Sequence, residues 1–259
     1  MQERPHLLTS THKASLEQHG YCVIEDVLEP SQTADVRHRL AEAADENERR
    51  GVPTYIEGLD PNPANVRVFN LLDLDPVFVE LISHPLALEI AQHVLDDDFI
   101  ISNFTANIAK PGSGSMFVHS DLALVLPEPW HAPWSLNVIW CLDDAHGDNG
   151  ATRFLPGSHR FERMADVPAD IARKMIPFEA KAGSVVAMEG RLWHTSGANK
   201  TQNQERALLF GYYCRSFIRP QWNFSEALSA DSKSLLSEEL MEMLSLGIAA
   251  NLKPFNGPV

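Results

Sequence analysis

Two short stretches in the second half of the chain carry side chains able to hold a metal ion. In FVHSD, His119 and Asp121 lie two positions apart. Alternate side chains of a strand share one face, so this imidazole and carboxylate would converge on one ion. The second stretch, RLWHTSG, supplies His194 after an apolar segment. Two histidines and one carboxylate on one side of an ion, with open positions opposite, are the ligands of non-haem Fe(II) oxygenases.

Each half of this set is weak evidence on its own. A His-x-Asp pair such as His119 and Asp121 is frequent by chance. His194 alone would also suit a hydrogen-bonded residue inside a barrel. The metal hypothesis therefore depends on both stretches meeting in the fold.

A cation, Arg206, follows His194 by twelve positions in the apolar segment RALLFGYY. If this segment is a strand, Arg206 shares its face with Leu208, Phe210 and Tyr212. A buried guanidinium is costly without a partner, and it matches a carboxylate through two parallel hydrogen bonds. The pattern predicts either a carboxylate-bearing cosubstrate at Arg206 or a buried ion pair with an Asp or Glu of the protein.

The elements that position these residues change in character along the chain. The first hundred residues are mainly helical in pattern, with Thr9 or Ser10 capping a helix before Gly20 and Ser31 capping a longer one before Gly51. YCVIEDV between them alternates like a strand, and DPVFVELISHPLALEIAQHVL has helical periodicity. Residues 225–250 look helical again.

From Phe99 onward the pattern favours strands. Short segments rich in β-branched and aromatic residues alternate with turn formers such as PGSGS, GDNG, PGSH and KAGS, as in an antiparallel sandwich or barrel. The expected strands are FIISNFTANIAK, MFVH, SLNVIWCLD, TRFLP, SVVAME and RALLFGYYCRS. We expect one catalytic domain over 1–259, with a helical N-terminal region over 1–98, a β core over 99–219 and a helical extension over 220–259.

Composition excludes several classes of protein. The 259 residues are 44% hydrophobic and 22% charged, as in globular domains, and the net charge of −14 disfavours nucleic acid and anionic membrane surfaces as partners. Cys22, Cys141 and Cys214 are too far apart for a disulfide framework or a zinc site, which favours a reducing, cytoplasmic location. No signal peptide or membrane span is expected. A homodimer is left open.

The combined motifs resemble the phytanoyl-CoA dioxygenase family. The resemblance rests on His119-Ser120-Asp121, on DNGATRFLPGSH at 148–159, and on His194 with Ser196 and Arg206. HGYCVIEDVL and VRVFNLL are similar too, so the likeness runs from about Gly20 to Arg215. The run Asn-Gly-Ala-Thr-Arg is closest to the fungal alkaloid and meroterpenoid branch of the family.

This resemblance implies a fold and a cofactor. The expected fold is a double-stranded β-helix, a jelly-roll of the cupin type, flanked by helices. By this resemblance, Fe(II) would be held by His119, Asp121 and His194. 2-Oxoglutarate would chelate it through its keto acid end, and the distal carboxylate would meet Arg206 and Ser196. Oxygen would convert this cosubstrate to succinate and carbon dioxide.

The implied reaction oxidises a small, partly apolar metabolite, as in specialised-metabolite biosynthesis. Hydroxylation, desaturation, epoxidation, ring expansion and endoperoxide formation remain open. The alternatives are an acyl-CoA hydroxylase and a catalytically inactive binding or sensor protein of the same fold. A halogenase is disfavoured because Asp121 occupies the position that a halide would take.

Further cosubstrate contacts are candidates with a structural alternative each. Trp140 precedes the Asn149-Gly150 turn and would lie against 2-oxoglutarate, or be a core aromatic. The Thr152 hydroxyl would donate to the cosubstrate. Asn103 and Asn107 share a strand face and would touch cosubstrate or substrate, or else be structural amides.

Overall fold

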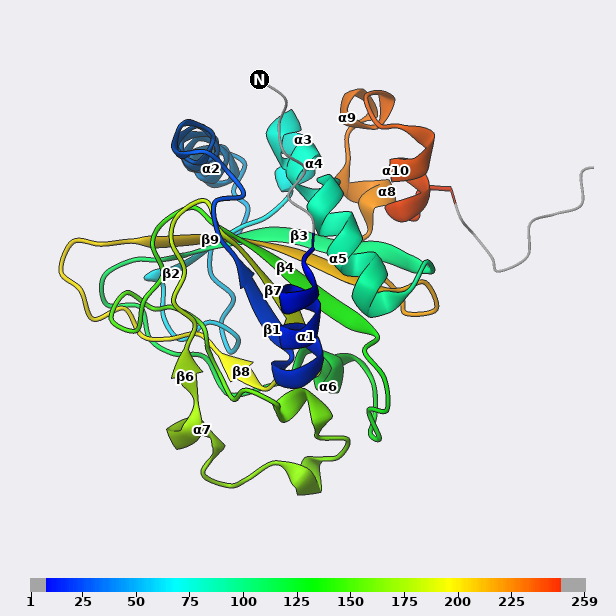
Figure 1. Cartoon of the computed structure of the whole chain (residues 1–259). Coiled ribbons are helices and arrows are strands. Elements are labelled where there is room, and N and C mark those ends of the chain that lie inside the picture. The colour runs from blue at the N-terminus through cyan, green and yellow to red at the C-terminus, as the bar shows by residue number, and fades with distance from the viewer. Residues whose placement is uncertain (1–7, 248–259) are drawn as a thin grey trace, which may run out of the picture.

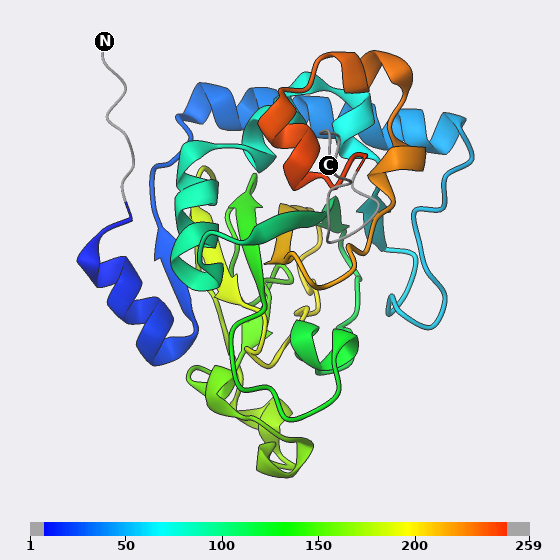
Figure 2. The same cartoon turned by 90° about the vertical axis from the view of Figure 1, so that its right-hand side faces the viewer.

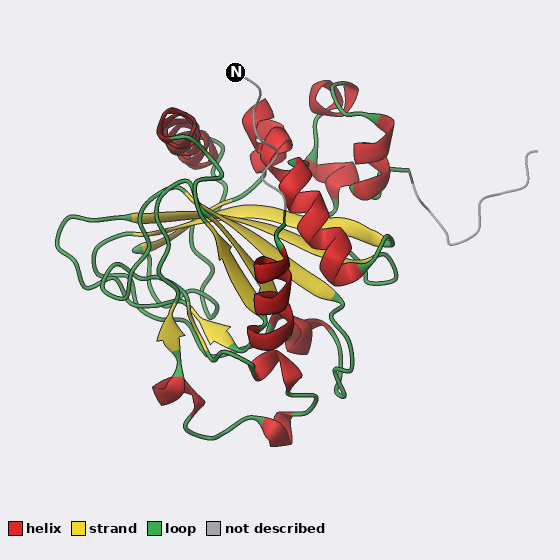
Figure 3. Ribbon diagram, in the orientation of Figure 1, coloured by secondary structure: helices red, strands yellow, loops and turns green. Residues whose placement is uncertain are grey.

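The computed structural model describes residues 8–247, and its centre is a pair of β-sheets. The larger sheet has six strands in the order β1-β7-β4-β9-β3-β2, with antiparallel pairing throughout, and the smaller has the order β6-β5-β8 (Figure 1, Figure 3). The large sheet contains β1 Tyr21–Ile24, β2 Asn65–Val68, β3 Phe99–Ala109, β4 Ser135–Cys141, β7 Val185–Glu189 and β9 Arg206–Arg215. The small sheet contains β5 Arg153–Phe154, β6 Ile176–Pro177 and β8 His194–Thr195.

Most helices lie on the outer face of the large sheet (Figure 1, Figure 2). They are α2 Pro30–Arg49, α3 Leu71–Leu74, α4 Pro76–Ile82, α5 Pro85–Leu95, α8 Phe224–Ala227, α9 Ala230–Ser234 and α10 Glu238–Met243. The others are α1 Ser10–His19, α6 Asp121–Val125, α7 Ile171–Lys174 and two 3-10 turns, Ser158–Arg160 and Met164–Asp166. No helix within residues 8–247 is long and apolar enough to span a membrane.

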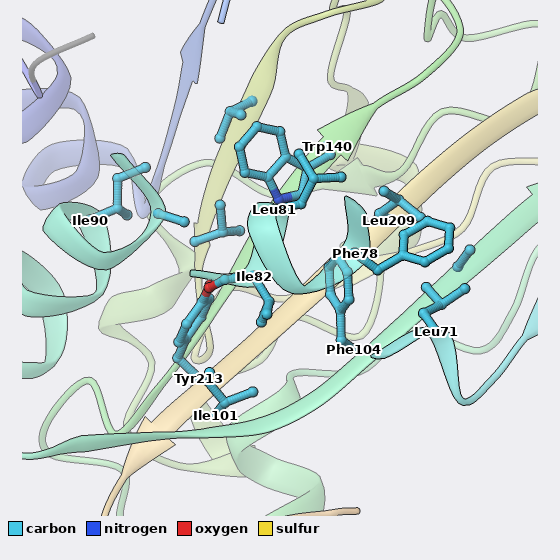
Figure 4. Close-up of a cluster of buried hydrophobic side chains, with 14 of the residues drawn as sticks. Leu71, Phe78, Leu81, Ile82, Ile90, Ile101, Phe104, Trp140, Leu209 and Tyr213 are labelled. Atoms are coloured by element: carbon cyan, nitrogen blue, oxygen red, sulfur yellow. The ribbon is translucent and has the colours of Figure 1, made fainter. Parts of the chain in front are cut away.

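Two of the three hydrophobic clusters among the described residues mark an outer and an inner layer. The outer cluster fills the space between the large sheet and the helices, and it contains Phe78, Trp140 and Tyr213 (Figure 4). The inner cluster joins inward side chains of the large sheet, such as Ile139, to Phe154 of the small sheet. This arrangement of two sheets with a shared interior is the expected double-stranded β-helix.

Local signals explain where the first helices begin and end. Thr9 is the N-cap of α1 and accepts from the His12 amide, while Gly20 ends this helix in the left-handed conformation, as predicted. α2 begins at Pro30 with Glu29 as its N-cap, not at Ser31, because proline suits the first helical position.

The structure differs from the expectation in four further places. The periodic segment before Phe99 forms two helices, because Pro85 begins α5 at its first turn. MFVH is not a strand; it contributes only the single bridge between His119 and His194. β2, from the region expected to be mainly helical, joins the large sheet beside β3, whereas β1 is the strand expected in YCVIEDV and pairs with β7. The predicted C-terminal helix is three short helices as far as Met243, and 248–250 lie outside the described residues.

Candidate metal and cosubstrate site

Three side chains predicted to bind a metal meet at one point. The ligand atoms of His119, Asp121 and His194 all lie within 4.8 Å of one another. The backbones of the two histidines exchange hydrogen bonds of 2.9 and 2.8 Å, which joins the loop before α6 to β8. Asp121 Oδ1 lies 3.7 Å from Nε2 of His119 and 3.8 Å from Nε2 of His194. These atoms form one face of a coordination site.

The histidines are oriented as ligands. His119 Nδ1 lies 3.0 Å from the carbonyl of Phe117, and His194 Nδ1 lies 2.8 Å from the carbonyl of Leu192. A hydrogen bond from Nδ1–H to a carbonyl leaves the Nε2 lone pair for an ion. Burial, then the nearby His194, lowers the pKa of His119 to about 4, so its imidazole is neutral at pH 7. The donor set therefore fits Fe(II), an ion that imidazole and carboxylate ligands suit.

Asp121 is held from two sides. It begins α6, whose N-cap Ser120 accepts from the Ala123 amide and donates to the Gly190 carbonyl. Its other carboxylate oxygen, Oδ2, accepts from Asn137 Nδ2 at 2.5 Å. Asn137 was not predicted; the structure places it on the same inward face of β4 as Ile139, in a strand whose sequence is buried throughout.

Arg206 is the buried cation of the barrel interior. It is 1% exposed, and its Nε and Nη2 donate to the Gly150 carbonyl at 3.1 and 2.8 Å. Its Nη1 donates to Asn107 Oδ1 at 3.1 Å. Among residues 8–247 no Asp or Glu forms an ion pair with it, so the alternative of a buried ion pair is excluded for this stretch of the chain. Burial lowers its pKa to about 10, which leaves it charged at pH 7.

The other predicted cosubstrate residues divide into two groups. Thr152 is buried two residues after Gly150, and the Ser196 hydroxyl accepts from the Met116 amide at 2.9 Å. Both directly adjoin the β5–β8 pair, in which Arg153 faces Thr195 and Phe154 faces the metal ligand His194. Asn107 instead positions Arg206, because its Oδ1 accepts from the guanidinium and its Nδ2 donates to Asn65 at 2.6 Å.

Trp140 is not part of the site, and this prediction is wrong. It is fully buried in the outer cluster, with Leu81 nearby (Figure 4). The His84 ring meets it edge-on, with the two ring centroids 5.3 Å apart. Alternate residues of β4 point to opposite faces, and Ile139 and Cys141 are the neighbours that point inward.

Asn103 lies on the inward face of β3 at its far end from Arg206. Its Nδ2 donates to Gln221 Oε1 at 3.3 Å, and it is the strand partner of Tyr212. It therefore belongs to the metal end of the barrel, away from the Arg206 end.

Two sheets that enclose a face of two imidazoles and one carboxylate define a non-haem iron oxygenase of the double-stranded β-helix class. Arg206, buried and without an ion pair among the described residues, adds a place for a carboxylate in the same interior.

Comparison with known proteins agrees with this geometry. Residues 16–207 match the phytanoyl-CoA dioxygenase family, and the chain belongs to that family. Dioxygenase af480 of Aspergillus fumigatus is 45% identical over 234 residues, which cover 90% of this chain and 76% of that protein. The Fe(II)/2-oxoglutarate-dependent dioxygenase nvfF of Aspergillus novofumigatus is 28% identical over 202 residues, covering 73% and 65%.

A solved structure shares the fold. The non-haem alpha-ketoglutarate-dependent carbocyclase SnoK from nogalamycin biosynthesis has a TM-score of 0.67 and 21% identity, covering 84% of this chain and 88% of that one. Family, fold and ligand set agree, and the chain is an Fe(II)/2-oxoglutarate-dependent dioxygenase. Its cosubstrates are 2-oxoglutarate and oxygen.

Proposed function

We propose that the chain couples turnover of 2-oxoglutarate to oxidation of an uncharged, largely apolar small molecule, with Arg206 as the anchor of the cosubstrate. The observation that carries this proposal is the charge of Arg206, which is fully buried and forms no ion pair with an acidic side chain of residues 8–247. Asp143 acts on its charge only from a distance and is itself ion-paired with Arg37. The fixing partners of Arg206, Gly150 and Asn107, are neutral. A carboxylate ligand would supply the missing counter-charge.

The protein's own groups have separate tasks in this reaction. His119, Asp121 and His194 would hold Fe(II), which together with 2-oxoglutarate supplies the oxidising chemistry when bound. Arg206 would orient the cosubstrate through its distal carboxylate, with Thr152 and Ser196 as hydroxyl donors beside it. Burial of this interior limits water near the reacting groups, which strengthens each charged contact.

The surroundings of the metal ligands favour an uncharged, apolar substrate. The Phe117 ring is 47% exposed and its centroid lies 5.1 Å from the His119 ring. Arg67, a cation whose charge lowers the pKa of His119, donates to the fully buried carboxylate of Asp60 at 2.8 and 2.9 Å. A cation already paired in this way is a poor site for the phosphates of an acyl-CoA. We therefore favour a specialised metabolite over an acyl-CoA.

The test is succinate formation by the purified chain with Fe(II) and 2-oxoglutarate. We expect slow turnover even without substrate, lost in His119→Ala, Asp121→Ala and His194→Ala proteins that remain folded. A catalytically inactive binding or sensor protein would bind metal and 2-oxoglutarate but form no succinate. Succinate formation that persists in a folded ligand variant would remove that residue from the site.

A further inference from the structure

One side chain beside the metal ligands has no task in the function proposed above. Asn137 lies in the middle of β4, with Met188 of β7 and Tyr212 of β9 as its strand partners. It is 7% exposed, and its Nδ2 donates to Asp121 Oδ2 at 2.5 Å. A buried amide therefore faces a carboxylate that the metal also needs.

The two oxygens of Asp121 point to different groups. Oδ1 lies 3.7 and 3.8 Å from the Nε2 atoms of the two histidines, which is the side where an ion would bind. Oδ2 points to Asn137. The backbone of Asp121 is fixed by the start of α6, but nothing in α6 fixes the rotation of the carboxylate. Among the described residues the amide is the hydrogen-bond donor to that carboxylate.

We infer that Asn137 is a positioning residue that restricts Asp121 to coordinate the ion through Oδ1 alone. This inference rests on the assignment of His119, Asp121 and His194 as metal ligands. Groups that hydrogen-bond to metal ligands orient them, and losing one such partner typically weakens metal binding or activity by about 10- to 100-fold.

Coordination of the ion through one oxygen of Asp121 matters because 2-oxoglutarate and oxygen need the remaining coordination positions. His119, Asp121 and His194 would leave open positions on the ion for the keto acid end of 2-oxoglutarate and for oxygen. A carboxylate free to rotate would bind through both oxygens and take one of those positions. Loss of Asn137 should therefore weaken 2-oxoglutarate binding at the metal end, without any change at Arg206.

A neutral amide is the side chain that suits this task. An Asp at position 137 would repel Asp121, and a Lys or Arg would form an ion pair that competes with the metal for the carboxylate. Asn donates a hydrogen bond and leaves the negative charge of Asp121 for the ion. A purely structural role is the alternative: a buried amide needs an acceptor, and Asp121 is within reach.

The experiment uses Co(II) as the probe in the metal-free, full-length chain. Co(II) affinity is measured by titration, and the ligand-field absorption of bound Co(II) reports the number and arrangement of its ligands. 2-Oxoglutarate is then titrated into the Co(II)-loaded protein, which needs no turnover. The variants are Asn137→Leu, which has the same branching but donates no hydrogen bond, and Asn137→Ser, which keeps a small polar side chain in the strand.

The matched control is Asn103→Leu. Asn103 flanks Tyr212 on its other side, on the same inward face, but its amide donates to Gln221. We expect both Asn137 variants to bind Co(II) about 10- to 100-fold more weakly, with an altered absorption spectrum and weaker 2-oxoglutarate binding. The control should match the wild type in Co(II) affinity and in the absorption spectrum.

Two other results separate the possible failures. Folded Asn137 variants with wild-type Co(II) affinity and spectrum, even if less stable, would overturn the positioning role while leaving the metal site intact. A His119→Ala protein that binds Co(II) as well as the wild type would instead overturn the ligand assignment itself, and the proposed function with it.

Discussion

Replacing Arg206 with methionine tests the link between its buried charge and the cosubstrate. Methionine fills a similar volume but cannot donate a hydrogen bond. Without 2-oxoglutarate we expect the free energy of unfolding to change by no more than about 2 kcal/mol, because two effects oppose each other. The variant leaves the Gly150 carbonyl without its donor, but it also removes a 1%-exposed cation that has no acidic partner among residues 8–247.

The effect on 2-oxoglutarate binding should be much larger. A hydrogen bond to a charged group contributes about 1.5–3 kcal/mol, and about 1.4 kcal/mol is tenfold in affinity, so the dissociation constant should rise roughly 10- to 100-fold. At 100 times the wild-type dissociation constant, the ligand stabilises the wild type by about 2.7 kcal/mol. The variant should gain only about 0.4 to 1.4 kcal/mol at the same concentration.

Chemical unfolding of the Co(II)-loaded protein, with and without 2-oxoglutarate, measures both quantities. Arg215→Met is the control, because Arg215 lies at the other end of β9 and pairs with the exposed Asp96. It should retain the full stabilisation by 2-oxoglutarate. If Arg206→Met retains it as well, another cation meets the distal carboxylate and our reasoning from burial is wrong.

Three further predictions follow from the surroundings of Trp140, of the three cysteines and of His119. Trp140→Phe should lower the free energy of unfolding by about 1–3 kcal/mol and leave 2-oxoglutarate affinity unchanged, as a titration would reveal. Because burial raises the pKa of Cys22 and Cys141 to about 12 and that of Cys214 to about 11, a thiol reagent should modify all three only as fast as the chain unfolds. The pKa of His119 is about 4 in the folded protein and 6.5 in the unfolded chain, so between these pH values the unfolded state binds the proton more strongly. The free energy of unfolding of the metal-free protein should therefore fall as the pH is lowered from about 6.5 to 4. Denaturant titrations at each pH should show a smaller decrease in the His119→Asn protein.

The sequence predicted the site where its signal is local or periodic. His119 and Asp121 are two residues apart, so they could be predicted to bind the same ion without knowledge of the fold. Arg206 was found because strand alternation places a charge among apolar side chains, and the structure buries it there. The helix caps at Thr9 and Gly20 are also local signals, and both were predicted correctly.

Trp140 was misplaced because β4 gives no alternation to read. Every residue of SLNVIWC is buried, since helices cover one face of the strand and the small sheet covers the other. A strand buried on both faces is apolar throughout, and its sequence does not say which residues point inward. β2 was missed for a related reason: it has four residues, and its pairing with β3 joins segments about forty residues apart.

The two charged groups of the site are held in the same way, and this was beyond the reach of the sequence. Arg206 is fixed by the Gly150 carbonyl and Asn107, and Asp121 by the amide of Asn137. All three partners are neutral, so each charge is oriented but not cancelled. A salt bridge would orient these groups equally well, but a ligand would then have to break it. Because these partners are neutral, Arg206 keeps its positive charge for an anionic ligand and Asp121 keeps its negative charge for a metal ion. The partners can be recognised only in the folded structure, which brings them together with the two charged groups.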